Sequence, residues 1–239
     1  MKLTENQINK IKEYVRFDYP NETCGIINSE GKVIRLKNIA EDTETHFILP
    51  HNTFISHDVV GIFHSHCNKA DDMTEQDMQS QIATSVPWIL CACFPDTITE
   101  PYSWGDDYIP PLIGREFRHG ASSSDDKGDC YALIKDWYFL EKGVKLPVYP
   151  RSNFWWDNGK DLYSDFFGSA GFEEVDVKGI PQIGDVALMK IRSKVENHAA
   201  VFVEDQFFLH HLYNRLSRRE PAARWNRMIS RWVRYVKKD

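Results

Sequence analysis

Two histidines and an aspartate near residue 65 are the first side chains in the chain that could do chemistry together. The stretch GIFHSHCNKADDMTEQD places His64 and His66 one residue apart and Asp77 eleven residues later. Side chains two apart in a strand point to the same face, so the two imidazoles should lie together. A helix that starts at Thr74 would put Asp77 in its first turn, where it can fold back towards the strand end. Two histidines and one carboxylate form an open zinc site, with the fourth position left to water.

A metal site of this kind also needs a base. The metal lowers the pKa of its water to about 7 and polarises a carbonyl, and a nearby carboxylate must then take the proton of the water. Glu22, in NETCGII, is the candidate. The alternative reading of the spacing is an exposed strand end, in which Asp77 only completes the cap formed by Thr74.

A cysteine at a helix start is the second feature with chemical potential. The stretch KGDCYALIKDWY places Cys130 where the helix dipole favours a thiolate. A nucleophilic cysteine also needs a base. The stretch HAAVFVEDQFFLH should fold back about residues 204–206, and a turn of odd length puts His198 and His210 on one sheet face. His198 could then act as the base and His210 could orient it. The alternative is a core cysteine with two surface histidines.

The elements that must position these residues follow from capping signals and apolar periodicity. Helices are predicted at 4–18, where Thr4 and Gln7 form a capping box, at 74–85, and at 129–143, where Gly143 is a natural C-cap. Strands are predicted at 23–36 as a hairpin, and at 58–66, 88–94, 184–191 and 198–211. Residues 95–128 are rich in proline, glycine and serine, which indicates a linker. We therefore predict an α+β protein with domains at 1–97 and 121–239 and a linker at 98–120.

Composition excludes several classes of protein. The chain has 239 residues, a net charge of −6 and 42% apolar residues, so it can bury a core and does not resemble a disordered protein. The negative charge disfavours binding to nucleic acid, although residues 224–239 are locally basic. No apolar run is long enough for a membrane span, and the charged start does not resemble a signal peptide. Five cysteines, an odd number, favour reduced thiols over a disulfide framework.

Several other residues leave alternatives open. Cys91 and Cys93 share a strand face, but small buried apolar residues are a better explanation for them than metal ligands. Trp155 and Trp156 could line a substrate groove or belong to an aromatic core. His211 competes with its neighbour for the third place in the cysteine site, although its side chain should point to the other face of the sheet.

The N-terminal pattern resembles the JAB/JAMM metalloprotease family. The resemblance covers residues 1–97 and rests on His-Ser-His, seven residues, Thr, two residues and Asp, with an upstream Glu before a Cys-Gly strand. It implies a mixed sheet with flanking helices and a bound Zn²⁺. It also implies roles for the residues of the pattern: His64, His66 and Asp77 as ligands, Glu22 as the base, and Thr74 in place of the serine that steadies the oxyanion. Cys67 stands where a proline often follows the second histidine.

The C-terminal pattern resembles the NlpC-like cysteine peptidases, which have a papain-like fold. GDC opens a helix, GDV opens a strand, and two histidines follow twelve residues apart. The resemblance implies that Cys130, His198 and His210 act on peptidoglycan stem peptides. Tyr131 and Ala132 replace the Ser-Gly pair that often follows the cysteine. The tyrosine often found about a dozen residues upstream is Phe117 here or is absent, which leaves one contact to the oxyanion open.

The succession of the two domains resembles a family of phage tail-tip proteins, through the stretches SWGDD, FWWDNG, NHAAVF and LHHLYNRLS. This resemblance implies a protein made in the host cytoplasm, carried at the virion tail tip and acting at the host cell wall. Its partners would be stem peptides, cut near γ-D-glutamate, and other tail tip proteins. A structural tail-assembly factor with inactive sites, or a maturation protease that cuts a tail protein, are the alternatives.

Overall fold

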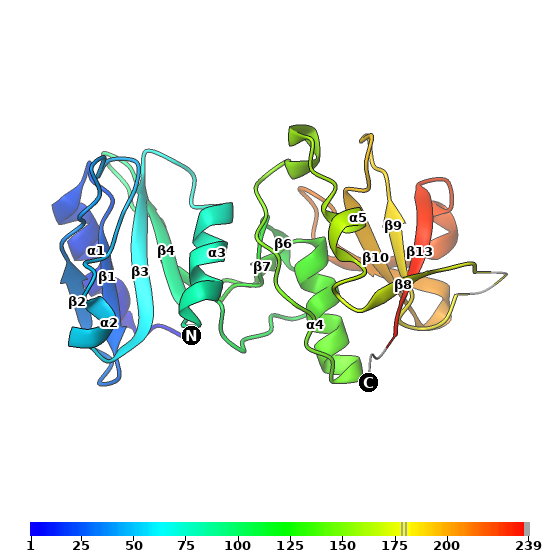
Figure 1. The fold of residues 1–239 in the computed structure, drawn as a ribbon, viewed down its shortest axis with the longest axis horizontal. Helices are drawn as coiled ribbons and strands as arrows, with labels where there is room; N and C mark the ends of the chain where they lie inside the picture. The colour runs from blue at the N-terminus through cyan, green and yellow to red at the C-terminus, as the bar shows by residue number, and fades with distance from the viewer. Residues whose placement is uncertain (178, 180, 237–239) are drawn as a thin grey trace. The chain divides into compact units, whose positions relative to one another are not determined.

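The computed structural model describes residues 1–177, 179 and 181–236 and divides the chain into two compact units. Unit 1 comprises Met1–Tyr108 with Ser123–Asp125, and unit 2 comprises Ile109–Ser122 with Asp126–Asp239. Each unit combines helices with its own larger sheet, and Figure 1 shows the order of the elements along the chain. The protein is therefore α+β, as predicted from the sequence.

Unit 1 is built on a five-stranded sheet of order β2-β1-β3-β4-β5. Only β3 and β4 run parallel, and the other neighbours are antiparallel. Figure 1 shows α1 and α3 on opposite sides of this sheet. The bounds are α1 Glu5–Asp18, β1 Cys24–Asn28, β2 Val33–Leu36, α2 Thr53–Ser56, β3 Val59–Cys67, α3 Glu75–Thr84, β4 Trp88–Cys93 and β5 Tyr102–Trp104.

The two faces of this sheet have different roles. Helix α1, capped by Thr4 through the predicted capping box, buries Ile11 and Val15 against one face. Phe63 lies in the same apolar cluster, so that face carries the odd-numbered residues of β3. Alternation along the strand turns the even-numbered residues to the face of α3. The cluster also contains Cys91 and Cys93, which confirms that these cysteines are core residues.

The predicted linker at 98–120 is wrong as a description of this segment. Tyr102–Trp104 form β5, pair with β4, and are fully buried as the edge of the sheet of unit 1. Further along, Arg115 is buried in unit 2, where its guanidinium donates to Asp136 at 2.7 Å. Proline and glycine signal turns in this stretch but do not reveal that the short segments between them are packed.

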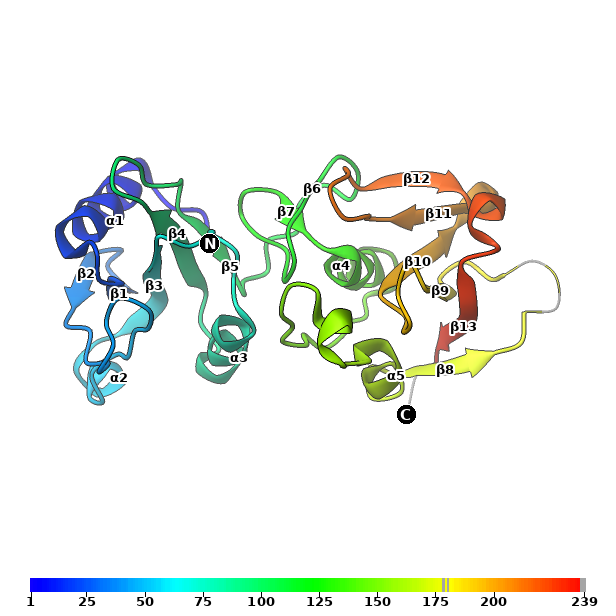
Figure 2. The ribbon, with the colours of Figure 1, turned by 90° about the horizontal axis from the view of Figure 1, so that it is seen from above.

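Unit 2 is built on a six-stranded sheet of order β12-β11-β10-β9-β13-β8, in which all described pairs are antiparallel. Figure 2 shows α4 beside this sheet. The bounds are β6 Glu116–Phe117, β7 Lys127–Gly128, α4 Cys130–Lys142, η1 Trp155–Asn158, α5 Leu162–Phe166, β8 Phe172–Val175, β9 Val186–Met189, β10 His198–Val203, η2 Glu204–Gln206, β11 Phe207–His210, β12 Arg218–Pro221, η3 Ala222–Trp225 and β13 Ile229–Tyr235.

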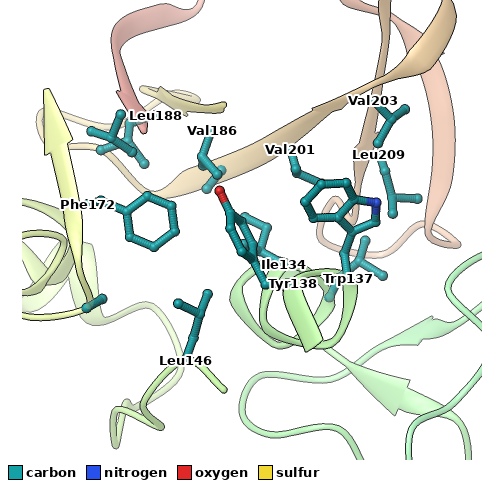
Figure 3. Close-up of a cluster of buried hydrophobic side chains, with 14 residues drawn as sticks. Ile134, Trp137, Tyr138, Leu146, Phe172, Val186, Leu188, Val201, Val203 and Leu209 are labelled. Atoms are coloured by element: carbon teal, nitrogen blue, oxygen red, sulfur yellow. The ribbon is translucent and has the colours of Figure 1, made fainter. Parts of the chain in front are cut away.

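The main core of unit 2 lies between α4 and the sheet. Ile134, Trp137 and Tyr138 point from α4 towards Val201 and other apolar residues of the sheet, as Figure 3 shows. Gly143 ends α4 in the left-handed conformation, at φ 66°, as expected for its predicted C-cap. This packing fixes the start of α4, and therefore Cys130, against the strand that begins at His198.

Across the residues that the structure describes, no helix is both long enough and apolar enough to cross a membrane.

Candidate active sites

In unit 1 the structure brings together the three predicted metal ligands. One nitrogen of each imidazole and one oxygen of Asp77 all lie within 4.8 Å of one another, and all three residues are buried. His64 Nε2 is 3.3 Å from Asp77 Oδ1, and His66 Nε2 is 3.4 Å from Asp77 Oδ2. The residues come from the end of β3 and from the first turn of α3, as the strand–helix reading predicts.

The hydrogen bonds around these side chains leave the right atoms available for a metal. His66 Nδ1 lies 3.1 Å from the carbonyl of Ala70, which favours a proton on Nδ1 and a lone pair on Nε2. Among the residues that the structure describes, neither ring nitrogen of buried His64 has a hydrogen-bond partner. Thr74 donates from its backbone N–H and its hydroxyl to Asp77 Oδ2, each at 2.7 Å, so Oδ1 remains open towards His64. The donor set fits Zn²⁺.

Thr74 and Asp77 form the capping box of α3, since the Asp77 N–H also donates to the Thr74 hydroxyl at 3.1 Å. The alternative reading from the sequence, in which Asp77 completes the cap, is therefore correct as far as the cap is concerned. It does not compete with a metal site, because the cap engages Oδ2 and leaves Oδ1. The hydroxyl of Thr74 is committed to Asp77, so its predicted contact with an oxyanion remains a prediction.

Glu22 lies next to the same cluster. The Thr23 N–H donates to Ser65 Oγ and the Ser65 N–H to the Thr23 carbonyl, so the pairing of β1 with β3 continues beyond the strand. That register places Glu22 opposite His66 and on the same face. Burial raises the pKa of the Glu22 carboxyl, although the imidazoles and the ammonium of Lys69, 3.5 Å away, oppose the shift. A raised pKa suits a general base.

In unit 2 the nucleophile candidate Cys130 is the first residue of α4. Asp129 is the N-cap and accepts from the N–H of Ala132 at 2.9 Å. Arg151 holds the same carboxylate with two hydrogen bonds, Nε to Oδ2 at 2.5 Å and Nη2 to Oδ1 at 2.8 Å. Asp129 and Arg151 are both buried. This ion pair fixes the start of the helix, and the sequence analysis missed it because Arg151 lies in an irregular segment.

His198 and His210 meet as predicted. The pairs Val203 with Phe207 and Ala200 with His210 flank a three-residue turn at Glu204–Gln206, so the two histidines share a face. His198 Nε2 lies 3.2 Å from His210 Nδ1. Both residues are buried.

Tyr163 is a functional candidate that the sequence analysis missed. Its hydroxyl, on the short helix α5, lies 3.2 Å from Cys130 Sγ. Phe117 has no hydroxyl to offer, so Tyr163 is the tyrosine that contacts the thiol in the structure. Position 163 is 33 residues downstream of the cysteine, and no local pattern in the sequence links the two.

A cavity of about 350 Å³ joins these residues. Cys130, His198 and His211 line it, and so do Trp155 and Trp156. Most of the wall is apolar, and many of its side chains are aromatic. Trp155 is also buried, so it both lines the cavity and belongs to an aromatic core. His210 is not among the described residues that line the cavity, so it lies behind His198.

The pKa values of Cys130 and His198 bear on whether the cysteine is a thiolate at rest. Burial raises the pKa of Cys130, and the charge of Asp129 adds to this shift. The Tyr163 hydroxyl and the Ala199 N–H only partly oppose it, and the resulting pKa is about 11. Cys130 keeps intermediate exposure because it faces the cavity. Burial also holds the pKa of His198 well below 6.5. These pKa directions run against the expected thiolate and favour a neutral thiol and a neutral imidazole in the resting site.

Comparison with known proteins identifies relatives of both the C-terminal part and the whole chain. The NlpC/P60 family model matches residues 114–234. Tail tip assembly protein K of Escherichia phage N15 is 29% identical over 98% of this chain and 96% of its own length. Tail tip assembly protein K of Escherichia phage lambda is 34% identical over 71% of this chain and 78% of its own length.

Among solved structures, NlpC1 from Trichomonas vaginalis is similar with 18% identity and a TM-score of 0.37, over 53% of this chain and 41% of that one. The family match includes Cys130, His198 and His210, and the two phage relatives extend the similarity to unit 1. The chain therefore belongs to the NlpC/P60 family and to the family of tail tip assembly protein K of lambda-like phages.

Proposed function

We propose that this tail tip protein is a cysteine endopeptidase that cuts peptidoglycan stem peptides, at the bond between γ-D-glutamate and the diamino acid. The observation that carries the proposal is the arrangement in unit 2: Cys130 and His198 line one cavity, and His210 supports His198 from behind. Membership of the NlpC/P60 family indicates a cysteine peptidase. A tail tip protein would reach the wall of the host during infection.

Acylation starts from neutral groups. The raised pKa of Cys130 favours a neutral thiol over a preformed thiolate, because burial disfavours a charge on the sulfur. His198 therefore takes the thiol proton as the sulfur attacks the carbonyl carbon. His198 Nε2 lies 3.2 Å from His210 Nδ1, and in this mechanism His198 carries a proton on Nε2 and donates it to His210. Nδ1 of His198 is then the ring nitrogen that takes the thiol proton. The C–N bond then breaks, a thioester forms, and His198 gives the proton to the leaving amine.

In deacylation His198 again transfers protons, first from water and then to the thiolate. Water attacks the thioester with His198 as its base, the acid leaves, and the thiol recovers its proton. Tyr163 supports both steps because burial raises the pKa of its hydroxyl well above 10, so it stays a donor. At 3.2 Å from Sγ, this hydroxyl can reach the oxygen of a carbonyl bonded to the sulfur.

We further propose that unit 1 holds Zn²⁺ through His64, His66 and Asp77. Support comes from the open donor atoms described above and from the tautomer that Ala70 favours on His66. When bound, the ion would supply Lewis acidity and an activated water. Glu22, buried beside His66, would receive a proton. The substrate would be a peptide or isopeptide of the wall or of a tail protein.

One observation favours a second function for unit 2. The cavity wall beside Cys130 is mainly apolar, and it includes rings from Phe154, Trp155 and Trp156. Such a wall suits an apolar segment of a protein better than it suits the charged groups of a stem peptide. A maturation protease that cuts a tail protein is therefore the second candidate.

Purified sacculi separate the two functions. Wild-type protein should release fragments with a new N-terminus on the diamino acid, detected by mass spectrometry, and Cys130→Ser should release none. The serine variant should keep wild-type helicity and zinc content, since one atom changes at a helix start. His198→Ala removes the proposed base and should also release none. His51→Ala, at an exposed histidine of unit 1, is its matched control and should stay active. If wild-type protein leaves sacculi intact but cuts a tail protein through Cys130, the second candidate replaces the first.

A further inference from the structure

A carboxylate faces the imidazole that lies behind His198. Glu220 is on β12, and its pairing with Phe208 puts it on the same face as His210. Its Oε2 lies 3.4 Å from His210 Nε2, and the same oxygen accepts a hydrogen bond from Trp225 Nε1 at 3.0 Å. The Trp225 ring packs edge-on against His210 at 4.8 Å between centroids. Glu220 therefore faces His210 from the side of Nε2, opposite the nitrogen that meets His198, and the Trp225 ring packs against both imidazoles.

The side chain of Glu220 is fixed independently of the histidine. Arg218 Nη2 binds Oε1 at 2.7 Å, so both oxygens have a partner and the side chain is only 13% exposed. The contact between Oε2 and His210 is within ion-pair range, but His210 Nε2 does not reach hydrogen-bond geometry in the resting structure. A small movement of the imidazole would complete the bond.

The position of one proton depends on this carboxylate. A neutral imidazole carries its proton on one nitrogen, and His210 has two different neighbours. With the proton on Nε2, the N–H points to Glu220, and the Nδ1 lone pair accepts from His198 Nε2. With the proton on Nδ1, the Nε2 lone pair would face a carboxylate, which is unfavourable. His198 Nε2 would then have to accept, and its own proton would move to Nδ1.

That second arrangement would disable the base. His198 could not take the proton of Cys130 at Nδ1, because that nitrogen would already carry one. We propose that Glu220 is a positioning residue that acts through His210: it holds the His210 proton on Nε2 and so keeps Nδ1 of His198 free for the thiol. This inference rests on the proposed roles of Cys130 and His198.

The charges around His210 agree with this role. Burial lowers the pKa of His210, Glu220 opposes this shift, the guanidinium groups of Arg218 and Arg215 add to it, and the resulting pKa is about 4. His198, on the neighbouring strand, is also kept neutral by burial. Both rings are therefore neutral at pH 7, and a neutral ring is the state in which a tautomer must be chosen.

Two variants and one control test the proposal. Glu220→Met has no acceptor, and we expect kcat on stem peptides to fall about tenfold with KM within about twofold. Glu220→Gln keeps an acceptor without the charge, and should lie between Glu220→Met and wild type. Arg219→Met, on the same strand, removes the ion pair with Glu204 and leaves the contacts of Glu220 in place, so its kcat should stay within about twofold of wild type. Equal losses in Arg219→Met and Glu220→Met would show that the loss comes from a disturbed β12 and not from the Glu220 carboxylate, which overturns the proposal.

A second readout needs no substrate. The ¹⁵N spectrum of imidazole-labelled protein reports which ring nitrogen carries the proton. Wild type should show His210 protonated on Nε2 at pH 7, and Glu220→Met should show a shift towards Nδ1. An unchanged His210 tautomer in Glu220→Met overturns the proposal even if activity falls. If wild-type protein cuts no stem peptide, the proposed function fails, and the spectrum still decides whether Glu220 controls the tautomer.

Discussion

The reactivity of Cys130 towards an alkylating reagent should reveal a resting thiol rather than a thiolate. The pKa of Cys130 is raised to about 11, from an ordinary value near 9. At pH 7 the thiolate fraction is then about one in ten thousand, against about one in a hundred for an ordinary cysteine. A more basic thiolate is also more nucleophilic, which recovers about tenfold. The net expectation is alkylation at pH 7 about tenfold slower than in an unstructured peptide.

The assay is iodoacetamide labelling from pH 6 to 10, with the Cys130 peptide quantified by mass spectrometry. A synthetic peptide spanning residues 127–135 is the reference, because it has the same neighbours without the burial. The rate on the protein should rise about tenfold per pH unit up to about pH 10. His198→Ala should leave this profile almost unchanged, because a neutral imidazole does not stabilise a thiolate. A fast rate that stays flat between pH 6 and 8, and that is lost in His198→Ala, would refute the neutral resting site.

Three further perturbations test separate parts of the structure. Tyr163→Phe removes only the hydroxyl 3.2 Å from Sγ, and we expect kcat on stem peptides to fall about 10²-fold while KM changes little, as for loss of one donor to an oxyanion. His66→Ala should lose zinc in elemental analysis whereas Glu22→Gln should keep it; a metal-free wild-type protein, prepared without chelator, would contradict this. Arg151→Met leaves the buried carboxylate of Asp129 unpaired and should lower the free energy of unfolding by about 3–5 kcal/mol, measured by urea denaturation; a loss under about 1 kcal/mol would show that the carboxylate finds other partners.

The features that follow strict geometric rules could be predicted from the sequence. The odd turn between β10 and β11 fixes which side chains share a face, so the meeting of His198 and His210 follows from counting residues. The capping signal at Thr74 fixes the first turn of α3, which brings Asp77 back to the strand end. Alternation along β3 then places the imidazole of His66 beside that of His64. Each of these relations spans a short loop or a single element.

The features that depend on packing between distant segments could not be predicted. Tyr163 approaches Cys130 only because α5 lies against the start of α4, and Glu220 reaches His210 only through the pairing of β12 with β11. The pKa of Cys130 is set by what surrounds the thiol, which the helix position alone does not reveal. Residues 102–104 resemble loop in composition because their strand is short and lies close to prolines.

The capping box of α3 also bears on the order in which a virion could be built. The carboxylate of Asp77 is oriented by Thr74 through ordinary hydrogen bonds, and the sheet that carries the imidazoles is held by an apolar core. Small zinc-dependent domains, by contrast, stay unfolded until the ion arrives. A metal-free chain of this family would already be folded and able to join a growing tail. Zinc could then be taken up at any time before infection, so the supply of the metal in the infected cell would not limit the rate of tail assembly.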